Sequence, residues 1–127
     1  MQGGNKIVYK ELSYEIIGVM FETYNELGYG HLEKVYCRAV EAGFKSRGLS
    51  YRKQVYYRIK YKGDIVGRNF LDFLVEGKII IEIKRGDYYS KKNIEQIKSY
   101  LKVTNLKLAI LVNFTSTGVK FYRLLNL

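Results

Sequence analysis

The sequence predicts an α/β fold in which a mixed β-sheet is flanked by helices. Two stretches with apolar residues at helical spacing open the chain, three strand-like stretches joined by short turns follow, and a third helical stretch leads into two more strands. A hairpin meander followed by a crossover helix and a further strand produces antiparallel and parallel pairs in one sheet. The 127 residues have the length of one domain, 1–127, whose first eight residues are expected to be frayed.

The amino-terminal third predicts two helices. Apolar residues recur every three or four positions over residues 13–27, and Gly28 follows as a stop signal. A second apolar face at helical spacing covers residues 32–44, and Gly48 ends that helix.

The rest of the chain predicts strands around one more helix. Residues 54–61 alternate with period two, and further strands are expected at 65–75, 78–84, 106–112 and 118–124. We expect Tyr56, Tyr57 and Tyr61 to be sheet packing. The helix between the third and fourth strands has Ser90 as its N-cap, and its apolar stripe consists of Ile94, Ile97 and Leu101.

The charge of the chain points to a polyanionic partner. Lysine and arginine number 22 against 12 acidic residues, a net charge of +10. A phosphate track is expected beside the first hairpin and along the third helix, formed by Arg58, Lys60, Lys62, Arg68, Lys91, Lys92, Lys98 and Lys102. For each of these residues taken alone, an ordinary solvated surface group is the favoured interpretation.

Other classes of protein are excluded or disfavoured by composition. A single cysteine, Cys37, rules out an internal disulfide and a thiolate metal cage, and a single histidine, His31, rules out a histidine-rich zinc site. No apolar run approaches the ~20 residues that span a bilayer, and we expect a cytoplasmic protein with no membrane association. Cys37 is expected to be a small buried group on the second helix, and His31 a surface residue near its start.

Three charged residues interrupt the predicted strands. Asp72 lies in the second strand, and Glu82 and Lys84 lie in the otherwise apolar third strand. Buried charges are costly unless they pair or bind metal, so a salt bridge involving Lys84 is one interpretation of this placement. The other is a site in which two carboxylates bind Mg²⁺ or Mn²⁺ and the lysine assists chemistry at a phosphate.

The second interpretation depends on the register of the hairpin. A two-residue loop of Glu76 and Gly77 places Asp72 and Glu82 on opposite faces of the sheet. A three-residue loop of residues 75–77, with Gly77 in the left-handed region, pairs Leu74 with Lys78 and makes Glu82 a diagonal neighbour of Asp72 on one face. The functional interpretation requires an even register of this kind.

Three motifs resemble those of a known family. Asp72 followed by Glu82-Ile83-Lys84 resembles the motif of the PD-(D/E)XK nuclease superfamily, although Leu71 stands at its nominal proline. Residues 30–36, GHLEKVY, are similar to the signature of the GxxExxY family within it, and Gln96 with Tyr100 resembles a Gln-x-x-x-Tyr element of its exonuclease-related branch. The resemblance covers roughly residues 12–124 and implies a restriction-endonuclease-like core with the element order ααβββαββ.

The resemblance also implies roles for individual residues. Asp72 and Glu82 would bind the metal by their side chains and Ile83 by its carbonyl, while Lys84 would be the catalytic lysine. Glu33 would reach the same metal, Gln96 would orient the site or touch substrate, and Tyr36 and Tyr100 would support them. Helical spacing puts Glu33 on an edge of the apolar face of its helix, although a solvated glutamate that stabilises the helix start remains an alternative.

These observations favour a Mg²⁺- or Mn²⁺-dependent nuclease acting on nucleic acid, with DNA as the first candidate and a homodimer as one possible state. The alternatives are a binding module that grips nucleic acid or a partner protein without cutting, and a structural ion-pair network of unrelated function.

Overall fold

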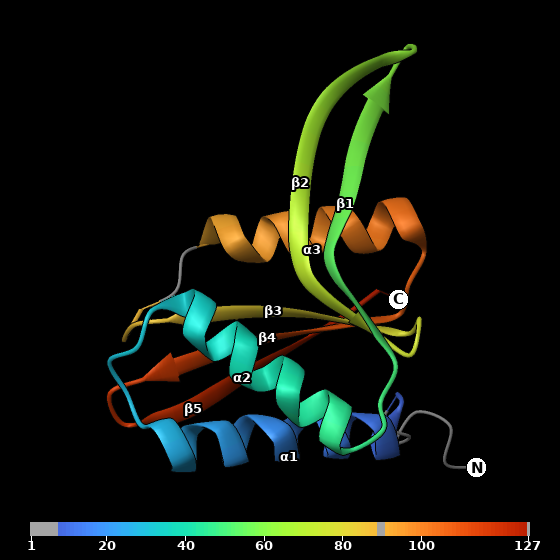
Figure 1. Ribbon diagram of the computed structural model, residues 1–127. Helices are drawn as coiled ribbons and strands as arrows, with labels where there is room; N and C mark the ends of the chain where they lie inside the picture. The colour runs from blue at the N-terminus through green and yellow to red at the C-terminus, as the bar shows by residue number, and fades with distance from the viewer. Residues whose placement is uncertain (1–7, 89–90, 127) are drawn as a thin grey trace, which may run out of the picture.

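The chain folds into three layers around a five-stranded mixed sheet (Figure 1). The computed structural model describes residues 8–88 and 91–126. Helices α1 (Lys10–Leu27) and α2 (Glu33–Ser46) cover one face of the sheet, and α3 (Lys91–Thr104) covers the other. The strands are β1 (Tyr51–Tyr61), β2 (Asp64–Val75), β3 (Ile79–Arg85), β4 (Leu108–Thr115) and β5 (Gly118–Leu125). The element order ααβββαββ and the α/β class are therefore confirmed.

The sheet has the strand order β1-β2-β3-β4-β5. Its pairs are antiparallel except for β3 and β4, which run parallel and are joined through α3. Strands β3 and β4 are buried over almost their whole length because helices cover both of their faces. The predicted hairpin meander with a crossover helix is thus present.

Two apolar cores form, one on each side of the sheet. The larger core lies under α1 and α2, where the Tyr36 and Phe114 rings stack with centroids 4.3 Å apart. The two helices meet closely at Gly43, since a Cβ there would lie 2.6 Å from Val19. The smaller core lies under α3 and contains Ile97, Tyr100 and Leu101.

The boundaries of several elements differ from the predictions. Helix α1 begins at Lys10 rather than residue 13, and β1 begins at Tyr51 rather than residue 54. Lys78 belongs to the turn, where its N–H donates to the Val75 carbonyl at 3.0 Å, so β3 begins one residue later than expected. Strand β4 runs from Leu108 to Thr115 instead of over residues 106–112.

Some expectations concern the ends of the described ranges. Val8 packs against the larger core, and its carbonyl accepts a hydrogen bond from Arg123 at 3.0 Å, so it is not frayed. Residues 1–7 and the proposed Ser90 cap lie outside the described residues. Of the helices in the described part of the chain, none combines the length and apolar character needed to cross a bilayer.

Candidate functional site

The hairpin between β2 and β3 sets the site, because it fixes the register of Asp72 against Glu82. Val75 pairs with Ile79, Leu74 with Ile80 and Phe73 with Ile81. The loop therefore consists of residues 76–78, one residue further along than the predicted three-residue loop. The register is even, as the functional interpretation requires, and continuing it by one step places Asp72 opposite Glu82.

The ladder between β2 and β3 ends at Phe73 and Ile81, and beyond this point β2 bends away with β1 (Figure 1). At this fork two main-chain N–H groups bond to carboxylates in place of ladder carbonyls. The Asp72 N–H donates to Glu82 Oε1 at 3.1 Å, and the Ile83 N–H donates to Asp72 Oδ2 at 2.7 Å. The two acidic side chains are thus fixed against each other at the fork.

A change of side in β1 and β2 turns Asp72 towards α2. Val55 and Leu71 belong to the core under α3, whereas Phe73 belongs to the core under α2. Gln54 and Asp72, which lie between the paired residues Lys53–Phe73 and Val55–Leu71, do not pair with each other in the β1–β2 ladder. Gln54 also has a positive φ of 47°. Both residues line a cleft of about 610 Å³ between the sheet and α2.

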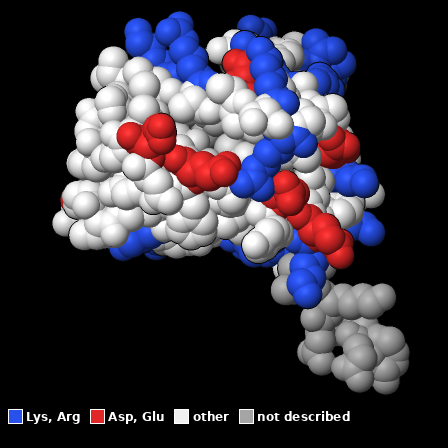
Figure 2. Space-filling model, turned by 60° about the horizontal axis from the view of Figure 1, so that its bottom comes forward, with Lys and Arg blue, Asp and Glu red and all other residues white. Residues whose placement is uncertain are grey.

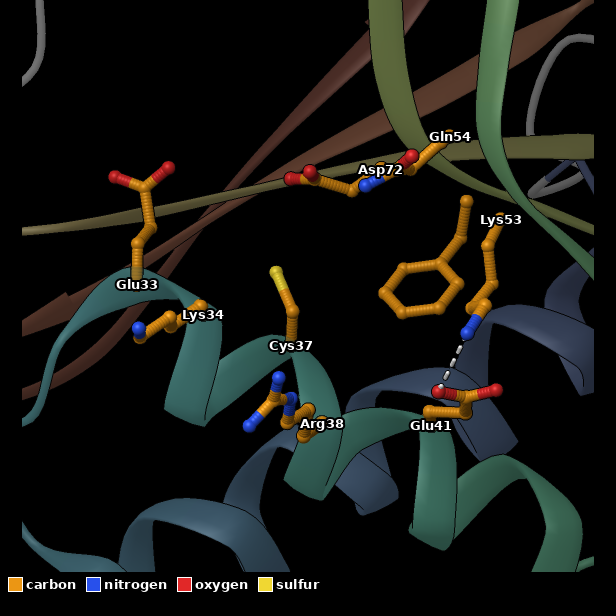
Figure 3. A pocket seen from close by; sticks show the side chains of 9 residues that line it. Glu33, Lys34, Cys37, Arg38, Glu41, Lys53, Gln54 and Asp72 are labelled. Atoms are coloured by element: carbon orange, nitrogen blue, oxygen red, sulfur yellow. Dashed lines mark hydrogen bonds and ion pairs between the residues drawn. The ribbon is translucent and has the colours of Figure 1, made fainter.

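The cleft places Asp72 opposite polar groups of α2. Figure 3 shows Glu33 and Cys37 extending from α2 towards the part of the sheet that carries Asp72. Further along the helix, Glu41 accepts hydrogen bonds from Tyr51 at 2.7 Å and Lys53 at 3.3 Å. Glu41 is therefore engaged at the far end of the cleft and is not part of the acidic pair.

Glu82 is the most deeply buried acid at the fork, with only 7% of its surface exposed. Burial raises the pKa of Glu82 from its ordinary 4.5 to about 8, and the neighbouring Asp72 charge adds to this effect. Two carboxylates held together with little water are unfavourable unless a proton or a cation neutralises one of them. Their hard oxygen donors fit Mg²⁺ or Mn²⁺.

Lys84 and Glu33 complete the charged cluster. The Lys84 ammonium lies 3.7 Å from Glu82 Oε2 and 3.7 Å from Glu33 Oε1. Glu33 therefore contacts the lysine, and this position favours a role in holding Lys84 over direct metal ligation. Within residues 8–88 and 91–126, no three His, Cys, Asp or Glu side chains gather closely enough to hold a metal ion by themselves. A metal at the fork would bind Asp72 and Glu82 and draw its remaining oxygens from a main-chain carbonyl such as that of Ile83, from water or from a phosphate.

Cys37 lies closer to the acidic cluster than its sequence context suggested. Burial, followed by the charges of Asp72, Glu33 and Glu82, raises the pKa of the Cys37 thiol to about 12. The thiol therefore stays protonated, and Cys37 is half-buried at the edge of the cleft instead of fully buried as expected. No sequence signal distinguished Cys37, Glu41, Lys53 or Gln54 as cleft residues, because their meeting depends on how α2 packs over the sheet.

Tyr36 holds the start of α2. Its hydroxyl donates to the Gly28 carbonyl at 2.6 Å, and its side chain is fully buried. His31 packs edge-on against the same ring and contacts the Leu27 carbonyl through Nε2 at 3.0 Å. Both residues fix the segment from which Glu33 projects, and neither lines the cleft.

The α3 residues lie on the other side of the sheet. Tyr100 is buried against Tyr57, with ring centroids 4.8 Å apart, and the Tyr57 hydroxyl donates to the Gln96 main-chain carbonyl at 3.1 Å. Burial raises the pKa of Tyr57, and the negative charge of Glu82 adds to it. Tyr57 therefore packs against the Gln96–Tyr100 turn of α3, and none of these three residues lines the cleft that contains Asp72.

The predicted basic residues occupy two regions. Arg58, Lys60, Lys62 and Arg68 are exposed on the β1–β2 hairpin, and Lys91, Lys92, Lys98 and Lys102 are exposed on α3. Lys98 lies 4.0 Å from Glu95. The face shown in Figure 2, where the underside with α1 comes forward, instead carries a band of acidic side chains. Basic side chains interrupt this band, and Arg47 pairs there with Glu15 and Glu22 of α1.

Comparisons with known proteins address the family and the fold of this chain. The sequence model of a family described as the PD-(D/E)XK nuclease superfamily matches residues 10–124. The crystal structure of SSO0001 is similar with a TM-score of 0.57 and 21% identity, over 74% of this chain and 50% of that one. The present chain therefore spans half the length of SSO0001 and shares its fold. No curated protein sequence matches significantly.

Proposed function

The chain belongs to the PD-(D/E)XK nuclease superfamily, and from this premise we propose that it is a Mg²⁺- or Mn²⁺-dependent nuclease that cleaves DNA. The observation that carries the proposal is the joining of Asp72 and Glu82 at the fork, with Lys84 3.7 Å from Glu82. We assign residues 30–36 to the GxxExxY group of this superfamily on the strength of the Gly30, Glu33 and Tyr36 pattern.

Asp72 and Glu82 would hold the metal. When bound, the metal supplies a water of lowered pKa and neutralises charge that builds up on the phosphate. Its positive charge would also keep Glu82 ionised, since the raised pKa reflects burial next to another carboxylate. Glu82 would thus release its proton when the metal ion binds.

Lys84 would act on the water or on the phosphate. Glu33 and Glu82 flank its ammonium group at equal distances of 3.7 Å and fix its position. From this position the ammonium can orient the attacking water and stabilise negative charge in the transition state. Gln96 would orient the site from α3, and Tyr36 and Tyr100 would keep α2 and α3 in place.

Exposed basic residues on the hairpin and on α3 would supply affinity for the phosphate backbone. Such affinity falls steeply with salt because bound counterions are released on binding. We also propose that the protein is cytoplasmic, in keeping with its one unpaired cysteine. We further propose that two copies form a homodimer, and analytical ultracentrifugation would measure this.

The test is hydrolysis by the purified chain of labelled single-stranded and duplex DNA and RNA. Activity is expected with Mg²⁺ or Mn²⁺ and not with a chelator, and Glu82→Ala and Lys84→Ala should each abolish most of it. Glu41→Gln is the matched control, because Glu41 is a carboxylate of the same cleft that bonds Tyr51 and Lys53 instead. Nucleic-acid binding without any metal binding or hydrolysis would identify a binding module instead.

A further inference from the structure

The distal part of the β1–β2 hairpin, residues 55–71, forms an arm that extends beyond the rest of the sheet (Figure 1). Its inner face is covered at the base by α3, where Val55, Tyr57 and Leu71 are buried. Its outer face consists of the alternate residues on both strands. Among residues 8–88 and 91–126, only the inner face of the arm contributes to an apolar core.

An aromatic pair opens the outer face. Tyr56 and Phe70 are direct cross-strand partners, and their ring centroids lie 5.1 Å apart at an interplanar angle of 46°. Tyr56 is 45% exposed and Phe70 59% exposed. The prediction that Tyr56, Tyr57 and Tyr61 are all sheet packing therefore holds for Tyr57 and is wrong for Tyr56 and Tyr61, which is 62% exposed. The two rings expose apolar surface to solvent, and a binding partner that covers them would bury this surface.

An arginine pair follows the aromatic pair along the arm. Arg58 and Arg68 are directly opposite each other, an arrangement that is unfavourable for like charges. Among the residues that the structure describes, neither forms an ion pair with a carboxylate. Between Tyr51 and Leu71 the chain has six basic residues and one acidic residue, Asp64. The outer face therefore suits a polyanion.

The aromatic pair lies next to the acidic site. Phe70 precedes Asp72 by two residues on the same side of β2, since Leu71 between them points towards α3. At the rise of a strand this separation is about 7 Å. Gln54, two residues before Tyr56 along β1, lines the same cleft. If a phosphate of a nucleic-acid strand reaches Asp72, the adjacent nucleotides of that strand would therefore lie over the rings of Tyr56 and Phe70.

We infer that the outer face of the arm is a base-stacking surface that receives unpaired bases of a single nucleic-acid strand, with Arg58 and Arg68 on its phosphates. The inference rests on the proposed function and specifies its substrate. Unpaired bases present free faces to the rings of Tyr56 and Phe70, whereas the bases of a duplex are already stacked on each other. The mixture of exposed rings and unpaired arginines is typical of surfaces that bind single strands.

The test measures binding without metal, in a chelator, so that no strand is cut. The probes are a labelled oligothymidylate of about 20 nucleotides and a duplex of the same length. The Tyr56→Leu/Phe70→Leu double variant keeps apolar side chains at both exposed positions but removes the rings. It should bind the single strand about tenfold more weakly, with an unchanged salt dependence, and bind the duplex as the wild type does.

Matched variants separate stacking from charge. Tyr56→Phe keeps a ring and should bind like the wild type. Arg58→Gln/Arg68→Gln should weaken both probes and lower the slope of log affinity against log salt by about 1.4 for the single strand. Circular dichroism and thermal melts check that each variant is folded.

The outcomes distinguish this inference from the proposed function. Undiminished single-strand binding by the double leucine variant, or an equal loss for the duplex, overturns the stacking role. Self-association of the wild type that the double leucine variant abolishes also overturns it and assigns the rings to a protein contact. If the wild type hydrolyses no nucleic acid with Mn²⁺ but shows the ring-dependent binding, the stacking surface stands and the nuclease proposal fails.

Discussion

Asp72 donates its main-chain N–H to the side chain of Glu82 at 3.1 Å, so a backbone hydrogen bond holds the two acids together against the repulsion of their charges. The return bond, from the Ile83 N–H to Asp72 at 2.7 Å, holds the Asp72 carboxylate in the same place. The geometry of the acidic pair is therefore set before any ion binds. A site that is preorganised in this way binds more tightly, because its side chains need not be reordered on binding.

The metal-free protein should lose stability as the pH rises. Burial raises the pKa of Glu82 to about 8 in the folded state, above its ordinary 4.5, so folding favours the protonated acid. This contribution is complete below pH 4.5 and is lost as the pH passes 8. Glu82→Gln should therefore be on the order of 5 kcal/mol more stable than the wild type at pH 9 and equal to it at low pH. Denaturant unfolding across this range measures the difference, and a constant difference at all pH values would contradict it.

The affinity for a metal ion should rise with pH, whereas the stability of the metal-free protein falls. A cation at the fork displaces the proton of Glu82, so affinity for Mn²⁺ should rise about tenfold per pH unit up to pH 8 and then level off. Calorimetry in buffers of different ionisation enthalpy would also show the released proton. Asp72→Asn should abolish binding, while Glu41→Gln, in the same cleft, should leave it unchanged.

Glu33 and Lys84 should separate metal binding from catalysis. Lys84→Ala removes the ammonium beside the phosphate and should lower the hydrolysis rate about 100-fold or more, with Mn²⁺ affinity retained. Glu33→Gln removes one of the two carboxylates that hold Lys84 and should slow hydrolysis about tenfold, also with Mn²⁺ affinity retained. Loss of Mn²⁺ binding in Glu33→Gln would instead make Glu33 a metal ligand, as the family resemblance implies.

Gln54 should control the position of Asp72. Its φ of 47° lies in the left-handed region, where a β-branched side chain is strongly disfavoured. Gln54→Val should lower the free energy of unfolding by about 1–2 kcal/mol and reduce activity, whereas Gln54→Gly should preserve both. Thermal melts and hydrolysis rates measured side by side decide the matter. Equal behaviour of the valine and glycine variants would mean that this backbone conformation has no bearing on the site.

Tyr36 offers a test of the support beneath α2. Tyr36→Phe removes the hydrogen bond to the Gly28 carbonyl but keeps the ring stacked on Phe114. We expect a loss of about 1 kcal/mol in stability and a slower reaction at unchanged metal affinity, because Glu33 begins the same helix. Chemical denaturation and calorimetry measure the two effects independently.

Local patterns predicted much of this protein. Period-two alternation and helical spacing are properties of short segments, so the order of helices and strands followed from them directly. Gly77 left two loop lengths open, one of which gave an even register, and the structure has an even register with a three-residue loop at 76–78 instead of 75–77 because Lys78 remains in the turn. Asp72 and Glu82 were found because charge is rare inside strands.

Other features depend on contacts between distant segments. Nothing in the sequence around Gln54 marks a left-handed residue inside a strand, and the change of side there results from packing on two different helices. The contact between Glu33 and Lys84 requires the start of α2 to meet the end of β3. The exposure of Tyr56 follows from the length of the hairpin beyond α3, since alternation alone cannot tell a solvent face from a second buried face.

The fork has a mechanical consequence. Asp72 occupies the junction where the arm leaves the body of the sheet, while Glu82 belongs to a strand buried on both faces. Bending of the arm would therefore move Asp72 and leave Glu82 in place. In the proposed nuclease, a nucleic-acid strand that pulls on the arm would therefore change the distance between the two carboxylates that we propose as metal ligands.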